Sequence, residues 1–245
     1  EAAGRLGDAP GVCVSTVGPG ATNLATGVGG AWLDASPVLA IVCTYDEAML
    51  GRRTQMRIDH LALFAPLTKD QRRLTRDGLG GAVADALALA VEEPPGPVLL
   101  ELPEDVGRAE ATDDVPEALP DRAASVNADG VGDQVLNALR SARRPLVVTG
   151  LGFTRIRAPY RLFDFLKTQH MPYVSTLHAK GFVPESYAGS LGVIGRARRT
   201  DVQRIVDTAD LIIAVGYDPI EINHEDWVGS TPVAHLSWEP AAPRF

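Results

Sequence analysis

Apolar residues along this chain come in short runs that alternate with stretches of helical composition. The runs at 11–17, 38–44 and 97–102 are mostly apolar at successive positions, as expected for strands with both faces buried. Between them, residues 21–35 and 78–91 combine small and apolar residues in a way that is typical of helices. Strands buried on both faces and separated by helices indicate a parallel sheet with helices on each side. The first part of the chain therefore predicts an α/β domain.

The composition changes after the last of these strands. Residues 106–130 are rich in acidic residues and prolines and poor in apolar residues, which predicts an extended linker. The alternation then starts again, with helices predicted at 131–142, 160–168 and 201–208 and strands at 145–149, 173–176, 211–215 and 233–238. We therefore expect two α/β domains with parallel sheets in three layers, at 1–105 and 131–245, joined by an acidic linker.

Composition and charge narrow the range of partners. Of the 245 residues, 45% are hydrophobic and 22% are charged, which is ordinary for a packed protein. The formal net charge of −8 argues against a nucleic acid or an anionic membrane as a partner, and no apolar stretch reaches the roughly 20 residues of a membrane-spanning helix. Cys13 and Cys43 lie in apolar runs, so we expect buried thiols of a reducing compartment rather than a disulfide. A cytoplasmic location is expected.

Candidate chemistry begins where the first strand meets the Gly-Pro-Gly sequence at 18–20. A dinucleotide-binding fingerprint needs G-x-G-x-x-G, but Asn23 stands where the third glycine belongs, and Pro19 stiffens a turn that phosphate loops keep as free amides. The same residues fit a structural turn in which glycines supply unusual dihedral angles and Thr22 or Asn23 caps the next helix. The partial fingerprint is weak, so these residues alone favour the structural turn over a dinucleotide site.

A longer set of segments resembles the acetolactate synthase group of thiamine-diphosphate enzymes. In the first half these segments are GPGATN at 18–23, SPV at 36–38, IDHLALFAPLTK at 58–69, PGPV at 95–98 and ELPEDV at 101–106. In the second half they are the apolar run from RP at 144–145 to Gly150, KG at 180–181, AD at 209–210 and GYDPIE at 216–221, the last being similar to flavin-independent, catabolic acetolactate synthases. The order is consistent over almost the whole chain. The resemblance implies a pyrimidine-binding domain followed by a Rossmann-like central domain.

The resemblance also implies a cofactor site, in which Pro19, Gly20 and Asn23 lie against the aminopyrimidine ring of thiamine diphosphate at a subunit interface. Glycine permits close approach, and the Asn23 amide offers both a donor and an acceptor. A 2-oxo acid substrate, a homodimer or homotetramer, and Mg²⁺ with ligands outside this chain follow from the same resemblance. Some relatives bind FAD or ADP in the central domain, where the GVIG sequence at 192–195 and Arg196, Arg198 and Arg199 could hold phosphates or could form a solvated face.

Two departures from the family pattern limit what this chain is expected to do alone. Many relatives place a glutamine near the substrate, and ungapped alignment puts Met56 there and Gln55 one position early. Either the loop shifts by one residue and Gln55 contacts the substrate, or the Met56 thioether replaces that polar contact and the substrate differs. The catalytic glutamate of the family would fall before residue 1, so Glu1 is not given its role, and the diphosphate-binding domain has no counterpart in the sequence. The 5 histidines lie far apart, which predicts no zinc site, and no G-x-S-x-G sequence supports a serine hydrolase.

The leading hypothesis is therefore a part of a thiamine-diphosphate-dependent 2-oxo acid carboligase or decarboxylase. The rival hypothesis is a non-catalytic, nucleotide- or partner-binding remnant of the same family. A Rossmann-type oxidoreductase ranks last, because the glycine fingerprint at 18–23 is only partial.

Overall fold

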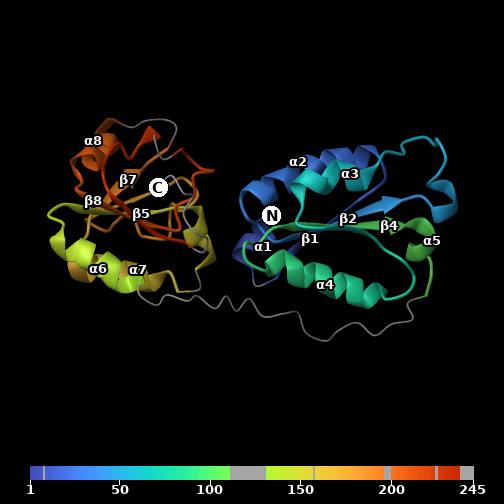
Figure 1. Cartoon of the computed structure of the whole chain (residues 1–245), viewed down its shortest axis with the longest axis horizontal. Coiled ribbons are helices and arrows are strands. Elements are labelled where there is room, and N and C mark those ends of the chain that lie inside the picture. The colour runs from blue at the N-terminus through green and yellow to red at the C-terminus, as the bar shows by residue number, and fades with distance from the viewer. Residues whose placement is uncertain (8, 111–130, 157, 196–199, 224–225, 238–245) are drawn as a thin grey trace. The chain divides into compact units, whose positions relative to one another are not determined.

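The computed structural model describes residues 1–7, 9–110, 131–156, 158–195, 200–223 and 226–237. The chain divides into two compact units, Glu1–Ala124 and Ser125–Phe245 (Figure 1). Each unit contains a parallel sheet with helices on both faces. The α/β fold class with two parallel sheets, which the alternating pattern predicted, is confirmed.

The first unit is built on a four-stranded sheet in the order β1-β2-β4-β3. Its strands are β1 (Gly11–Ser15), β2 (Val38–Thr44), β3 (Gln71–Arg73) and β4 (Pro97–Pro103). The central strands β2 and β4 are buried along most of their length, which explains their continuous apolar sequences. Strand β1 ends earlier than predicted, because Thr16 and Val17 already belong to the turn into helix α2 (Pro19–Leu33).

Helices cover both faces of this sheet (Figure 1). Helices α2 and α3 (His60–Phe64) pack on one face in a core with strand residues Ala40, Val42 and Leu99. Helix α4 (Leu79–Val91) packs on the other face against Leu39, Val98 and Leu100. The remaining short helices are α1 (Ala2–Leu6), η1 (Glu47–Met49), η2 (Ala65–Leu67) and α5 (Glu104–Gly107).

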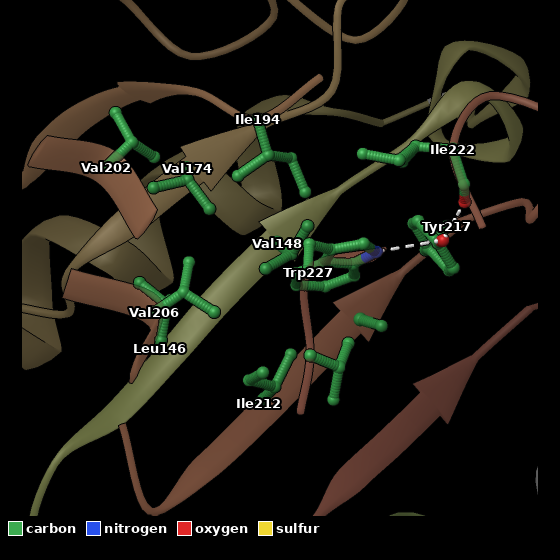
Figure 2. Packing of buried hydrophobic residues seen from close by; sticks show 12 residues of the cluster. Leu146, Val148, Val174, Ile194, Val202, Val206, Ile212, Tyr217, Ile222 and Trp227 are labelled. Atoms are coloured by element: carbon green, nitrogen blue, oxygen red, sulfur yellow. Dashed lines mark hydrogen bonds between the residues drawn. The ribbon is translucent and has the colours of Figure 1, made fainter. Parts of the chain in front are cut away.

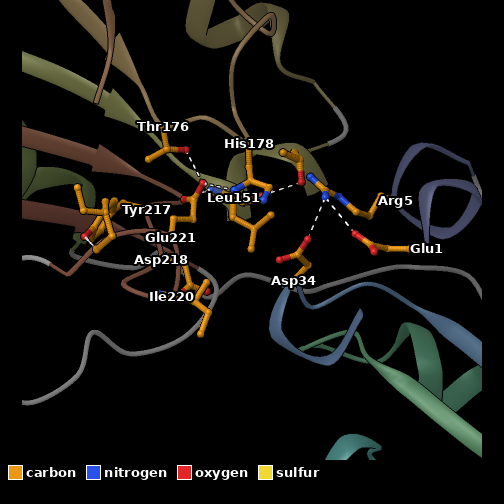
Figure 3. A network of polar contacts seen from close by, with 12 residues as sticks. Glu1, Arg5, Asp34, Leu151, Thr176, His178, Tyr217, Asp218, Ile220 and Glu221 are labelled. Atoms are coloured by element: carbon orange, nitrogen blue, oxygen red, sulfur yellow. Dashed lines mark hydrogen bonds and ion pairs between the residues drawn. The ribbon is translucent and has the colours of Figure 1, made fainter. Parts of the chain in front are cut away.

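Two side-chain clusters hold the ends of these helices. Arg5 of α1 lies 3.4 Å from a carboxylate oxygen of Glu1 and 3.3 Å from one of Asp34, which follows α2 (Figure 3). Nζ of Lys69 donates to the carbonyls of Leu89 and Glu92 at 2.7 Å and to that of Pro94 at 2.9 Å. A cation at this position satisfies carbonyls that the end of α4 leaves unpaired and complements the helix dipole.

The second unit has five strands in the order β7-β6-β5-β8-β9. They are β5 (Pro145–Thr149), β6 (Tyr173–Ser175), β7 (Ser190–Val193), β8 (Leu211–Val215) and β9 (Val233–Leu236). Helix α8 (Thr200–Thr208) lies on one face of the sheet, and helices α6 (Val131–Ser141) and α7 (Tyr160–Gln169) lie on the other (Figure 1). The strand order reverses between β5 and β8, which is the switch point of a Rossmann-like, doubly wound sheet.

The core under helix α8 contains two aromatic side chains with polar atoms (Figure 2). Trp227 donates from Nε1 to the Tyr217 hydroxyl at 3.0 Å, and that hydroxyl donates to the carbonyl of Ile222. Both polar atoms are therefore satisfied within an apolar core, as buried tyrosine and tryptophan require.

Several expectations need adjustment. The predicted linker lies mostly outside the described residues, and its first residues, Val106 and Gly107, end helix α5. Cys13 and Cys43 are free thiols but are half-buried rather than buried, because both lie on strands whose edges or ends reach the surface. Burial still raises the pKa of the Cys13 thiol. In the described ranges, no helix is long and apolar enough to cross a membrane.

The buried faces of β4 should dominate the stability of the first unit. Leu99 has no exposed surface, whereas Leu33, at the end of α2, is 53% exposed. We expect Leu99→Ala to lower the free energy of unfolding by about 2–5 kcal/mol, because it removes buried surface and leaves a cavity. Leu33→Ala should change it by less than about 0.5 kcal/mol. Urea unfolding of both variants measures the difference, and equal losses would contradict this assignment of the core.

Candidate functional site

The candidate site of the first unit lies at the carboxyl edge of its sheet. Because β1 and β2 are parallel, the segments that follow them, 16–20 and 45–59, leave the sheet at the same edge. Open parallel sheets bind ligands outside the carboxyl ends of their strands. Both segments that the sequence singled out for chemistry therefore start at this edge.

Gly18 has a backbone that only glycine adopts easily, with φ 64° and ψ −107°. A Cβ at this position would lie 2.1 Å from the carbonyl oxygen of Met56. The turn and the loop around Met56 are therefore in backbone contact. The expected side-chain cap is wrong: Gly18 is the N-cap of α2, and the Thr22 hydroxyl instead donates to the Pro19 carbonyl at 3.0 Å.

The exposed groups of this turn suit a flat, polar ring. Pro19 and Asn23 are exposed, and Gly20 is half-buried. Within the part of the chain that the structure describes, the Asn23 amide has no hydrogen-bond partner, so its donor and acceptor are both available. An exposed proline ring beside an available amide fits an aminopyrimidine, which has an apolar face and polar edges.

The loop after β2 brings the two predicted substrate residues close to this turn. The hydroxyl of Tyr45 donates to the carbonyl of Gln55 at 2.6 Å, which anchors the loop to the end of the strand. Met56 follows with a positive φ of 60°, and its side chain is 48% exposed. Both side chains are exposed, and their contact with a substrate stays a prediction.

Behind the turn lies a buried polar network that the sequence analysis did not find. The ring of His60 bonds the Gly18 N–H through Nε2 at 3.1 Å and Oε1 of Glu101 through Nδ1 at 2.9 Å. Nε of Arg73 donates to the other oxygen of Glu101 at 2.6 Å. A glutamate within the apolar strand at 97–102 was the sequence signal for this network.

Two effects of opposite sign act on Glu101, whose side chain is 2% exposed. Burial raises the pKa of Glu101, but the hydrogen bonds from His60 and Arg73, together with their charge effects, outweigh burial and hold that pKa below its usual value. Glu101 is therefore an ionised acceptor in the folded protein, and both of its oxygens are used.

A second buried carboxylate occupies the switch point of the other sheet (Figure 3). Glu221, whose side chain is 4% exposed, accepts from the Leu151 N–H at 2.7 Å, the Thr176 hydroxyl at 2.6 Å and Nδ1 of His178 at 2.9 Å. Burial raises the pKa of Glu221, and these donors only partly oppose the effect. Gly216, with φ 62°, packs so closely here that a Cβ would lie 2.1 Å from the nitrogen of Phe153.

The position of Glu221 affects where the nucleotide expected in the central domain could bind. An amide after the first strand of a Rossmann-like sheet is where a dinucleotide phosphate usually binds, and in this chain Glu221 accepts from that amide. A cavity of about 290 Å³ lies instead near strand β7, where Gly192 and the ion pair of Lys180 with Glu185 line it. Arg196, Arg198 and Arg199 lie outside the described residues.

No metal centre is evident in the described ranges, where no group of three or more His, Cys, Asp or Glu side chains could hold a metal ion. The sequence expectation that Mg²⁺ ligands lie elsewhere therefore stays a prediction.

Comparison with known proteins assigns both units to the same family. The family model described as thiamine pyrophosphate enzyme, N-terminal TPP binding domain, matches residues 1–63, and that of the thiamine pyrophosphate enzyme central domain matches residues 133–242. Together the matches cover more than two thirds of the chain. The chain belongs to the thiamine pyrophosphate enzyme family.

Individual relatives narrow the group. The acetolactate synthase of Arthrospira platensis is 31% identical over 248 residues, covering 94% of this chain and 42% of that protein. The acetolactate synthase large subunit of Corynebacterium glutamicum is 31% identical, covering 98% of this chain and 39% of that protein. The acetolactate synthase of Bacillus subtilis is 30% identical, covering 96% of this chain and 42% of that protein. The resemblance to this group is confirmed, and the chain spans about two fifths of the length of these relatives.

The backbone of Gly18 provides a test of the turn. We expect Gly18→Ala to lower the free energy of unfolding by at least about 1–3 kcal/mol, because alanine disfavours this φ and its Cβ would overlap the Met56 carbonyl. Gly27→Ala is the matched control, since Gly27 lies within α2 and a Cβ there meets no atom within 4 Å. It should raise the free energy of unfolding by up to about 1 kcal/mol. Urea unfolding measures both, and a neutral Gly18→Ala would contradict the geometry of the turn.

The contributions of the two buried carboxylates to the free energy of unfolding should depend on pH in opposite directions. The folded protein binds a proton at Glu221 more tightly than the unfolded chain, so its contribution to stability falls as pH rises from the ordinary value of 4.5 towards the raised pKa. At Glu101 the pKa is lowered, so the contribution is lost as pH falls below 4.5. We expect the free energy of unfolding of wild type minus that of Glu221→Gln to decrease with rising pH, and the corresponding difference for Glu101→Gln to increase. Urea unfolding at a series of pH values measures both slopes, and slopes of the same sign would contradict the two environments.

Proposed function

We propose that this chain forms the pyrimidine-binding and central parts of a thiamine-diphosphate-dependent carboligase that acts on 2-oxo acids, as an acetolactate synthase does. The observation that carries the proposal is the turn at 18–20, where Gly18 lets the backbone pack closely and the Asn23 amide stays available beside Pro19. The family matches and the acetolactate synthase relatives support the same assignment.

The described residues would bind and orient the cofactor rather than carry out the bond-breaking steps. When bound, thiamine diphosphate would supply the nucleophilic carbon and the electron sink that decarboxylation of a 2-oxo acid requires. Pro19 and Gly20 would contact the face of the aminopyrimidine ring, and the Asn23 amide would hydrogen-bond its edge. Gln55 or Met56, on the neighbouring loop, would line the space for the substrate.

Further features of the intact protein belong to the same proposal. Mg²⁺ would be bound by oxygen ligands outside this chain, as a diphosphate requires. A homodimer or homotetramer would bring a second subunit against the turn. The half-buried free thiols Cys13 and Cys43 support a reducing, cytoplasmic location.

A nucleotide in the central domain, ADP or FAD, receives little support at the switch point. Glu221 already accepts from the Leu151 amide there, and a phosphate would have to displace this buried carboxylate. The cavity beside Gly192 is another place where such a ligand could bind. The comparisons do not favour a non-catalytic remnant, because the relatives that match are acetolactate synthases.

The proposal predicts cofactor binding that depends on Asn23. We expect the full-length natural protein to bind thiamine diphosphate with Mg²⁺ in isothermal titration calorimetry and to release CO₂ from at least one member of a panel of 2-oxo acids. Asn23→Ala should weaken thiamine diphosphate binding about tenfold, the effect of one lost hydrogen bond to the ligand.

Gln134→Ala is the control for this experiment, because Gln134 is an exposed amide on α6 in the other unit. It should leave cofactor binding unchanged. Binding that is absent in the unaltered protein would overturn the proposed function, and binding that is equal in Asn23→Ala would remove Asn23 from the cofactor site.

A further inference from the structure

The turn at Gly18 is held from inside the first unit by a side chain to which the resemblance assigned no role. The Gly18 N–H donates to Nε2 of His60 at 3.1 Å, although the two residues are 42 positions apart in the sequence. His60 has no exposed surface. A buried residue of helix α3 therefore fixes the backbone immediately before Pro19.

The hydrogen bonds of His60 assign its tautomer. A ring nitrogen that accepts from an amide carries no proton, so the proton of the neutral ring is on Nδ1. Nδ1 donates to Oε1 of Glu101 at 2.9 Å, and the other oxygen of Glu101 accepts from Nε of Arg73 at 2.6 Å. Because every member of this chain of bonds has a defined direction, the ring cannot rotate without breaking a buried bond.

The loop that carries the predicted substrate residues also contacts the turn at Gly18. The carbonyl of Met56 faces Gly18, and the Tyr45 hydroxyl holds the Gln55 carbonyl at 2.6 Å. Gly18 thus contacts both His60 and this loop. A displacement of Gly18 would disturb both the cofactor turn and the substrate loop.

We propose that His60 is a positioning residue for the cofactor turn, and that Glu101 and Arg73 hold it in the tautomer that accepts from Gly18. The inference rests on the proposed function, because a fixed turn matters for affinity only if a ring binds against Pro19 and Asn23. A turn that is ordered before the ligand arrives loses less entropy on binding. His60 acts through the Gly18 backbone.

Two substitutions separate the two bonds of His60. Gln places its amide near the position of Nε2, so His60→Gln keeps a partner for the Gly18 N–H and loses the bond to Glu101. Asn places its amide near the position of Nδ1, so His60→Asn keeps a donor for Glu101 and leaves the Gly18 N–H unpaired. Each variant removes one buried hydrogen bond and part of the ring, so each controls for general damage to the core caused by the other.

We expect the full-length natural protein with His60→Asn to bind thiamine diphosphate about tenfold more weakly than the same protein with His60→Gln, as measured by calorimetry with Mg²⁺. Without cofactor, hydrogen exchange at the Gly18 amide should be faster in His60→Asn. Urea unfolding should show similar losses of stability for the two. Equal affinities and equal Gly18 exchange would overturn the positioning role and leave the proposed function standing.

If neither variant folds, NMR of the unaltered protein tests the tautomer of His60 and its hydrogen bond to Gly18. Nitrogen-15 NMR of labelled histidine should show a protonated Nδ1 and an unprotonated Nε2 at His60, with a scalar coupling across the hydrogen bond to the Gly18 nitrogen. A proton on Nε2, or a missing coupling with rapid exchange at Gly18, would overturn the inference. Failure of the unaltered protein to bind thiamine diphosphate would overturn the proposed function and this inference with it.

Discussion

In both units, the backbone polar groups of the parallel strands are paired with one another inside the sheet, and helices cover both faces. Polar side chains can then gather with access to solvent mainly where strands end. Parallel strands share one carboxyl edge, so segments that are distant in sequence meet there. The turn after β1 and the loop after β2 meet in this way, and Leu151 and Glu221 meet after β5 and β8. The geometry of each candidate region follows from this constraint.

The two buried carboxylates show how neighbouring groups decide what a buried charge does. Glu101 accepts from a guanidinium as well as a histidine ring, and its pKa is lowered. Within the described residues, the donors to Glu221 are an amide, a hydroxyl and a histidine ring, none of them a guanidinium, and the pKa of Glu221 is raised. The guanidinium of Arg73 carries a permanent positive charge, which helps to offset the cost of burying the Glu101 carboxylate. Glu101 therefore supports the turn as an ion, whereas Glu221 retains a proton to higher pH.

Much of the fold could be predicted from the sequence, because strands buried on both faces need apolar side chains at successive positions. The elements that were missed are those for which this requirement is weak. Strand β3 reads Gln-Arg-Arg at one edge of its sheet, and β7 lies at the edge of the other. Short edge strands tolerate polar residues, so their sequences carry no clear pattern. The N-cap of α2 was misassigned because a glycine with an unusual backbone replaced the expected side-chain cap.

The sequence by itself determined the fold class, the family and the turn at 18–20, since these depend on local pattern and on short ordered motifs. It could not select His60 from among the 5 histidines or connect it with Glu101. Those contacts join residues 41 and 42 positions apart, and they form only when α3 packs under the turn and β4 lies in the middle of the sheet. Packing decides which side chains pair across such separations. A hydrogen bond needs a short distance and the right angle, so it forms only after the sheet and its helices have brought the donor and the acceptor within reach.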